Sequence, residues 1–273
     1  MESKMDRRVS FLTGLALVGS MVLAAPLVRA DDDRGRDSQR NGCKDLPSHG
    51  ALRNALEDAR AQANGGFDLD MWGTIVDRDG IVCAVAFTGN HRGDQWPGSR
   101  VISAQKANTA NAFSLPGLAL STANLYSAVQ PGGSLFGLQE SNPVDHEVAY
   151  GGNPASYGRQ NDPMVGGRIG GVNVFGGGLA LYSSNGQLLG GLGVSGDSSC
   201  ADHNIAWRTR DALDLDTVPA GVSGDPDRKD NIVYDIASQA GQMPGVSAGG
   251  WGHPHCKDPA AETTIAAGLP KNE

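Results

Sequence analysis

The side chains best suited to metal or redox chemistry are six histidines and four cysteines. Three of them fall within four positions in His253-Pro254-His255-Cys256, and imidazole and thiolate are good ligands for zinc or copper. The proline between the two histidines makes this spacing unlike the standard zinc signatures. A disulfide through Cys256 is therefore the preferred interpretation, and a transition-metal site is the alternative.

The four cysteines are an even set, which in an oxidising compartment favours two disulfides. Four cysteines allow three pairings. The preferred pairing joins Cys43 with Cys256, at the two ends of the mature chain, and Cys83 with Cys200, within the core. The other two pairings stay open.

A glycine-rich run near residue 191 resembles two catalytic or cofactor signatures without satisfying either. Residues 191–196 match the G-x-G-x-x-G spacing, but that motif needs a strand, turn and helix in a parallel sheet, and the preceding Asn185-Gly186 indicates a hairpin. Residues 193–197 lack the last glycine of the G-x-S-x-G nucleophile elbow. We therefore predict no catalytic residues here, and expect glycines at a strand end where a ligand or a neighbouring subunit comes close to the backbone.

The N-terminus has the layout of an export signal. Basic residues are followed by an apolar stretch from Phe11 to Val28 and by a small-residue cleavage site ending at Ala30. The stretch is short and interrupted by glycine and proline, so we expect a signal peptide over residues 1–30 that is cleaved near Ala30 rather than a membrane span. We therefore expect a periplasmic or secreted protein, and the sequence leaves both the Sec and the twin-arginine export routes open.

Composition limits the partners of the mature chain. The formal charge of −8 becomes −10 when residues 1–30 are removed, because they hold four Lys or Arg and two Asp or Glu. Such an acidic protein has no general attraction for nucleic acid or anionic lipid, and no other segment is apolar for long enough to span a bilayer. The 39 glycines and 5% aromatic residues predict many turns and long loops rather than a helical bundle.

The pattern of apolar residues and turn signals predicts the elements that position these side chains. After a flexible leader over 31–47, we expect a helix from about 51 to 63, a hairpin of 71–76 and 81–87 around Asp79-Gly80, and a helix over 99–113. A long excursion over about 118–177 comes next. It is followed by a hairpin of 179–183 and 187–194 around Asn185-Gly186, a helix over about 201–213, and a C-terminal extension over 214–273 that wraps the core. This order predicts an α+β domain, with helices packed in two or three layers on an antiparallel sheet.

Five blocks in this order resemble the GlcG/HbpS-like haem-binding family, which is related to the PduO C-terminal domain. Their residues are Ile75-Val76-Asp77-Arg78-Asp79-Gly80, for the first hairpin; Ser99, Ala104, Lys106-Ala107 and Thr109-Ala110, for the second helix; Gly176-Gly177-Gly178-Leu179-Ala180-Leu181, for a strand entry; Gly190-Gly191-Leu192-Gly193-Val194-Ser195-Gly196, for a strand and turn; and Asp202 with Ile205-Ala206, for the last helix. The resemblance implies a profilin-like fold over residues 48–213 and assembly as a homo-oligomer. The excursion before residue 176 is longer than the family pattern, and Ala180 stands where members often have proline.

The resemblance also implies haem as the cofactor. Haem iron needs an axial donor, its propionates need cations or amides, and its faces need an apolar wall. Covalent attachment is excluded because the chain has no Cys-x-x-Cys-His. The candidates for the site are His49 and His91 as iron ligands, His203 as a further histidine, His146 as a residue that closes over the pocket, Arg100 and Lys106 as propionate partners, and Ser195 with Gly196 at the strand end.

We therefore expect an exported protein that binds haem or a related tetrapyrrole for storage, delivery or sensing, in a pocket at a subunit interface. One alternative is an enzyme that degrades haem or acts on a small metabolite such as a hydroxy acid. Another is a redox-responsive interaction module that uses the four cysteines.

Overall fold

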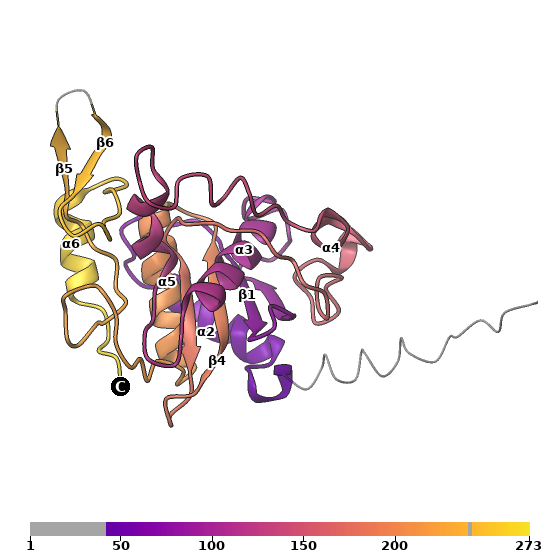
Figure 1. The fold of residues 1–273 in the computed structure, drawn as a ribbon. Coiled ribbons are helices and arrows are strands. Elements are labelled where there is room, and N and C mark those ends of the chain that lie inside the picture. The colour runs from indigo at the N-terminus through magenta and orange to yellow at the C-terminus, as the bar shows by residue number, and fades with distance from the viewer. Residues whose placement is uncertain (1–41, 240–241) are drawn as a thin grey trace, which may run out of the picture.

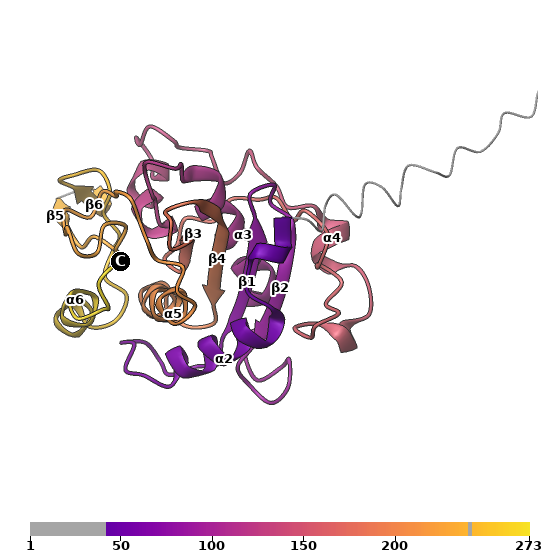
Figure 2. The same ribbon diagram turned by 90° about the horizontal axis from the view of Figure 1, so that it is seen from below.

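The computed structural model describes residues 42–239 and 242–273 (Figure 1). Its centre is a four-stranded antiparallel sheet in the order β2-β1-β4-β3 (Figure 2). The strands are β1 (Trp72–Asp77), β2 (Val82–Phe87), β3 (Gly178–Tyr182) and β4 (Leu188–Ser195). They form two hairpins, β1 with β2 and β3 with β4, which are joined through the pairing of β1 with β4. The predicted antiparallel α+β class is confirmed.

Local chemistry explains both hairpin turns. Gly80 and Gly186 each have a φ of +76°, a conformation that glycine adopts without steric cost. In the first turn the Asp77 carboxylate accepts hydrogen bonds from the backbone N–H groups of Asp79 and Ile81, each at 2.9 Å. The two turns therefore form where the Asp-Gly and Asn-Gly pairs predicted them.

Helices cover both faces of the sheet and make a three-layer domain (Figure 2). One face carries α2 (His49–Arg60) and α5 (Ser199–Ala212), and the other carries α3 (Ser99–Phe113). The cores of the two faces are separate: Leu56 and Ile75 belong to the first, and Val76 and Val101 to the second. This alternation of neighbouring residues on β1 follows from the two-residue period of a strand.

Two glycines on β4 let α3 lie unusually close to the sheet. A Cβ added at Gly193 would lie 1.9 Å from the carbonyl oxygen of Ser103, and one added at Gly191 would lie 2.3 Å from that of Ala107. The predicted close approach of backbone at this run is present. The backbone that approaches is that of α3 in the same chain.

The long excursion after α3 contains only short elements; its first part contacts the C-terminal extension, and its later part reaches the outer edge of β2. They are η2 (Thr122–Leu125), η3 (Ser127–Val129), α4 (His146–Tyr150) and η4 (Pro154–Ser156). Val82 donates its N–H to the carbonyl of Gly167 at 2.9 Å, and its own carbonyl accepts from Gly166 at 2.9 Å. These bonds fix the excursion to the exposed edge of the sheet.

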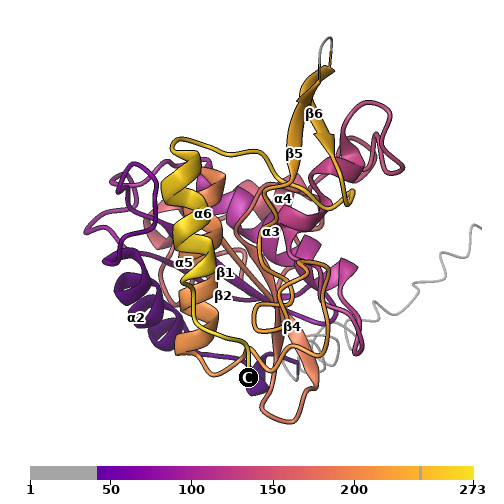
Figure 3. The ribbon, with the colours of Figure 1, turned by 90° about the vertical axis from the view of Figure 1, so that its left-hand side faces the viewer.

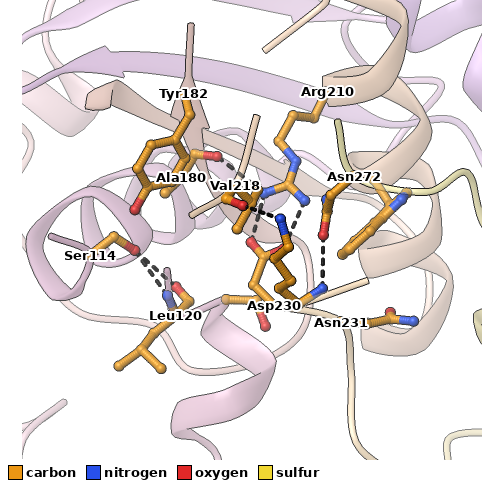
Figure 4. A network of polar contacts seen from close by, with 12 residues as sticks. Ser114, Leu120, Ala180, Tyr182, Arg210, Val218, Asp230, Asn231 and Asn272 are labelled. Atoms are coloured by element: carbon orange, nitrogen blue, oxygen red, sulfur yellow. Dashed lines mark hydrogen bonds and ion pairs between the residues drawn. The ribbon is translucent and has the colours of Figure 1, made fainter. Parts of the chain in front are cut away.

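The C-terminal extension wraps the core on the side of α5 (Figure 3). It contains β5 (Ile236–Gln239), β6 (Gln242–Ser247) and α6 (Pro259–Ala267), none of which the turn-rich sequence predicted. Tyr182 donates its N–H to the Leu215 carbonyl at 2.9 Å, which continues the sheet beyond β3. The buried Arg210 side chain of α5 pairs with Asp230 (Figure 4).

Two disulfides are present, but the preferred pairing was wrong. Cys43 pairs with Cys83, and Cys200 pairs with Cys256. Cys43 lies in a short helix, η1 (Gly42–Asp45), which packs beside the first hairpin, so its partner is on β2. Order therefore begins before Pro47, earlier than the predicted end of the leader.

The predicted signal peptide and most of the predicted leader lie in residues 1–41, outside the described residues. Within the described parts of the chain, none of the helices has both the length and the apolar character needed to cross a bilayer.

Candidate functional site

A cavity of about 630 Å³ opens between the loop after β2, the start of α3 and the excursion. This volume is within the range usual for small-molecule and cofactor sites. Its apolar wall consists of Trp72, Pro97, Val101, Tyr150, Pro154 and Tyr157. Two of the candidate residues, His91 and Arg100, are in its lining.

The side chains of this lining that can carry a positive charge are His91, Arg92 and Arg100. Its lining includes no carboxylate, although the whole chain has a formal charge of −8. Two carboxylates lie just behind the lining, with Asp162 paired to Arg100 and Asp94 bonded to the His91 backbone. Arg92 is therefore the cation of this lining that has no ion pair among the described residues, and it is available to an anionic ligand. A flat, apolar and anionic molecule is the chemistry that this lining suits.

His91 lies exposed at the mouth of the cavity, on a loop whose backbone is well held. The Asp94 carboxylate accepts a hydrogen bond from the His91 N–H at 2.7 Å, and the Gln95 side chain donates to the His91 carbonyl at 2.8 Å. Within the described residues, the imidazole ring itself forms no hydrogen bond. Its ring nitrogens are therefore available to a metal.

Arg100 also reaches the cavity, but its charge is used inside the protein. Its guanidinium donates through Nε to the Asp162 carboxylate at 2.9 Å, and Nη2 bonds the other oxygen of that carboxylate. Nη1 donates to the Ala149 carbonyl at 2.7 Å. The side chain is buried, so the guanidinium of this candidate propionate partner is already paired within the protein.

Lys106 and Gly196 meet in a closed polar cluster outside the lining of this cavity, and Ser195, which is buried at the end of β4, does not line the cavity either. The Lys106 ammonium donates to the Asp202 carboxylate at 2.7 Å. The other oxygen of Asp202 accepts from the N–H groups of Gly196 and Asp197, at 3.1 and 2.9 Å. Burial raises the pKa of Asp202 to about 6, although Lys106 opposes that rise. The pair connects α3, the end of β4 and α5, and three of the family-like blocks thus meet in a structural contact.

The other predicted histidines also lie outside the lining of the cavity. His203 is fully buried under the C-terminal extension, where its Nε2 accepts from the Ile232 N–H at 3.1 Å and burial lowers its pKa to about 4. His49, at the start of α2, donates from Nε2 to the Gly158 carbonyl at 2.9 Å. His146 is exposed at the start of α4. Of the predicted iron ligands, His91 alone lines the described cavity.

The cluster around Cys256 is covalent rather than metal-binding. Donor atoms of Cys200, His253 and Cys256 lie within 4.8 Å of one another, but the two sulfurs form a disulfide. The buried His253 donates from Nδ1 to the Pro254 carbonyl at 2.7 Å. The preferred interpretation of Cys256 as a disulfide cysteine is confirmed.

The sequence did not identify the aromatic wall or Arg92. Tyr150 and Tyr157 are isolated aromatic residues in a glycine-rich excursion, and only the fold brings them opposite Trp72. Arg92 had a usable signal, because it directly follows the candidate ligand His91.

Comparison with known proteins gave a family match and several similar solved structures. A family model described as "Haem degrading protein HbpS-like" matches residues 48–210. A search of curated proteins found no match. The crystal structure of a PduOC:heme complex is 27% identical with a TM-score of 0.43, and covers 62% of this chain and 96% of its own. The protein ORFY of Klebsiella pneumoniae, assigned to the DUF336 family model, is 25% identical with a TM-score of 0.41, and the match covers 61% of this chain and 90% of that one.

Proposed function

The chain belongs to the HbpS-like family, and from this premise we propose that it binds haem, or a related tetrapyrrole, in the cavity beside α3. The observation that carries the proposal is the lining of that cavity. It offers an aromatic wall, an imidazole ring that makes no hydrogen bond among the described residues, and the Arg92 guanidinium. These are the three requirements of a haem site.

The residues take distinct roles in this proposal. Tyr150 and Tyr157 would supply the apolar surface against which the macrocycle packs, and Arg92 would pair with a propionate at the mouth. His91 would supply the nitrogen that holds the iron. Bound haem would supply an iron centre for ligand binding or electron transfer. Arg100 has no role in binding a propionate here, because its guanidinium is already paired with Asp162.

We place this activity outside the cytoplasm, where haem binding serves storage, delivery or sensing. The export signal read in residues 1–30 supports this location, as do the two disulfides, which persist in oxidising compartments. We also propose a homo-oligomer with the mouth of the cavity at a subunit interface. Two large exposed aromatic side chains near the mouth, Trp96 and Tyr150, support that arrangement.

A hemin titration followed in the Soret region tests the proposal. The wild-type protein should bind one hemin per chain with a shifted Soret band. His91→Ala should lose that band shift or bind much more weakly. His255→Ala is the matched control, because His255 is also exposed but lies beside α6, and it should behave as wild type. Equal titrations for all three proteins would exclude His91 as the iron ligand.

Haem degradation is a second candidate, favoured by the description of the matching family model. Incubating the hemin complex with a reductant, with and without oxygen, separates binding from degradation. Loss of the Soret band only in the presence of oxygen would show degradation. Stable spectra under both conditions would leave binding as the function.

A further inference from the structure

One buried guanidinium holds together the part of the excursion that forms a wall of the cavity. Arg100 stands in the first turn of α3, and its side chain is 2% exposed. It binds the Asp162 carboxylate through two nitrogens and the Ala149 carbonyl through the third. Its Cζ lies 3.7 Å from the centre of the Tyr157 ring. A single side chain thus contacts the excursion at three separate points.

Asp162 extends this arrangement to the neighbouring backbone. Besides Arg100, its carboxylate accepts hydrogen bonds from the N–H of Gly158 at 2.6 Å and from that of Met164 at 2.8 Å. The carboxylate is 0% exposed, so its charge is balanced only within the protein. Breaking a buried pair of this kind leaves an uncompensated charge, which is much costlier than losing a surface ion pair.

The wall residues lie between these contact points. Tyr150 directly follows Ala149, and Tyr157 is the ring that stacks on the guanidinium. The Tyr157 hydroxyl donates to the carbonyls of Tyr150 and Gly151, at 3.0 and 3.1 Å. The two tyrosines are therefore positioned through Arg100 and through each other.

We infer that Arg100 is a positioning residue that fixes residues 149–162 as the wall of the ligand cavity. The identity of the ligand rests on the proposed function, whereas the role of Arg100 in holding the wall does not depend on it. Lysine cannot replace this arginine, because it lacks the planar fork that pairs with a carboxylate and stacks on a ring at the same time. In Arg100→Lys the wall should be formed in only a fraction of the molecules.

The chain contains a matched control for this change. Arg210 pairs with Asp230 through two nitrogens, at 2.6 and 2.8 Å, donates to the Ala180 carbonyl and lies 4.6 Å from the Trp207 ring (Figure 4). It is as buried as Arg100, but it holds the C-terminal extension on α5. Arg210→Lys therefore has a comparable structural cost at a site away from the cavity.

The test compares Arg100→Lys, Asp162→Asn and Arg210→Lys with the wild-type protein. Hemin affinity is measured by Soret titration, and the wall by hydrogen exchange of residues 146–163 with mass spectrometry. If the wall is formed in a tenth of the molecules, the apparent Kd rises about tenfold. We expect a rise of about that size or more for Arg100→Lys and Asp162→Asn, with faster exchange in the wall, and neither effect for Arg210→Lys.

The inference is overturned if both wall variants match Arg210→Lys in hemin affinity and in exchange over residues 146–163. If Arg100→Lys is too unstable to purify, Asp162→Asn decides, because asparagine keeps the shape of the side chain. If the wild-type protein binds no hemin, the proposed function fails, and the exchange comparison alone then decides whether Arg100 forms the wall.

Discussion

The contact between α3 and β4 makes Gly193→Ala a demanding test of the fold. An ordinary van der Waals contact begins at 3.4 Å, whereas the new Cβ would lie 1.9 Å from the Ser103 carbonyl oxygen and 2.4 Å from the Ala107 nitrogen. Both atoms belong to the backbone of α3, so no side chain can rotate away. The helix would have to move by about 1.5 Å, and overpacking of this kind costs about 3 kcal/mol.

Urea denaturation and thermal melting measure this cost. For a domain of this size, about 3 kcal/mol corresponds to a fall of about 6 to 12 °C in Tm. Gly117→Ala is the matched control, because no atom lies within 4 Å of its added Cβ, and its free energy of unfolding should stay within about 0.5 kcal/mol of wild type. If Gly193→Ala is as stable as Gly117→Ala, then α3 does not lie against β4 as described.

Two further predictions concern pH and the second disulfide. Burial lowers the pKa of His203 from 6.5 to about 4, so only the unfolded chain takes up a proton between these values. The free energy of unfolding should then fall by up to about 3 kcal/mol as the pH drops through that window, and His203→Gln should remove this part of the fall in urea denaturation at pH 7 and pH 4.5. An unchanged pH dependence would show that His203 is not buried. Replacing Cys200 and Cys256 together by serine removes the disulfide between residues 56 positions apart and should lower the free energy of unfolding by about 2–4 kcal/mol. Limited proteolysis of this variant should cut first within residues 214–273. Cleavage that starts elsewhere would contradict the anchoring role of this disulfide.

The sequence predicted those parts of the fold that depend on local chemistry. The turns at Asp79-Gly80 and Asn185-Gly186 specified both hairpins, since each pair supplies the backbone conformation that a tight turn needs. The second helix was predicted with the bounds that the structure has, 99–113. The helix and hairpin of the C-terminal extension were missed because proline and glycine hide their short periodic segments.

The candidate site depended on contacts that no local pattern records. Arg100 and Asp162 are 62 positions apart, and Lys106 and Asp202 are 96 apart. The sequence therefore identified basic residues on the second helix but not the carboxylates that neutralise them. His91 was found because it follows a well-predicted hairpin, which placed its loop near the start of that helix.

The central claim is that the cavity between the His91 loop, α3 and the excursion holds the tetrapyrrole. Anomalous scattering at the iron edge, from crystals grown with hemin, locates the metal without reference to any variant. We predict one iron per chain bound to the imidazole of His91, with the macrocycle against the aromatic wall that includes Tyr150 and Tyr157. Iron at another histidine, with this cavity empty, would contradict it.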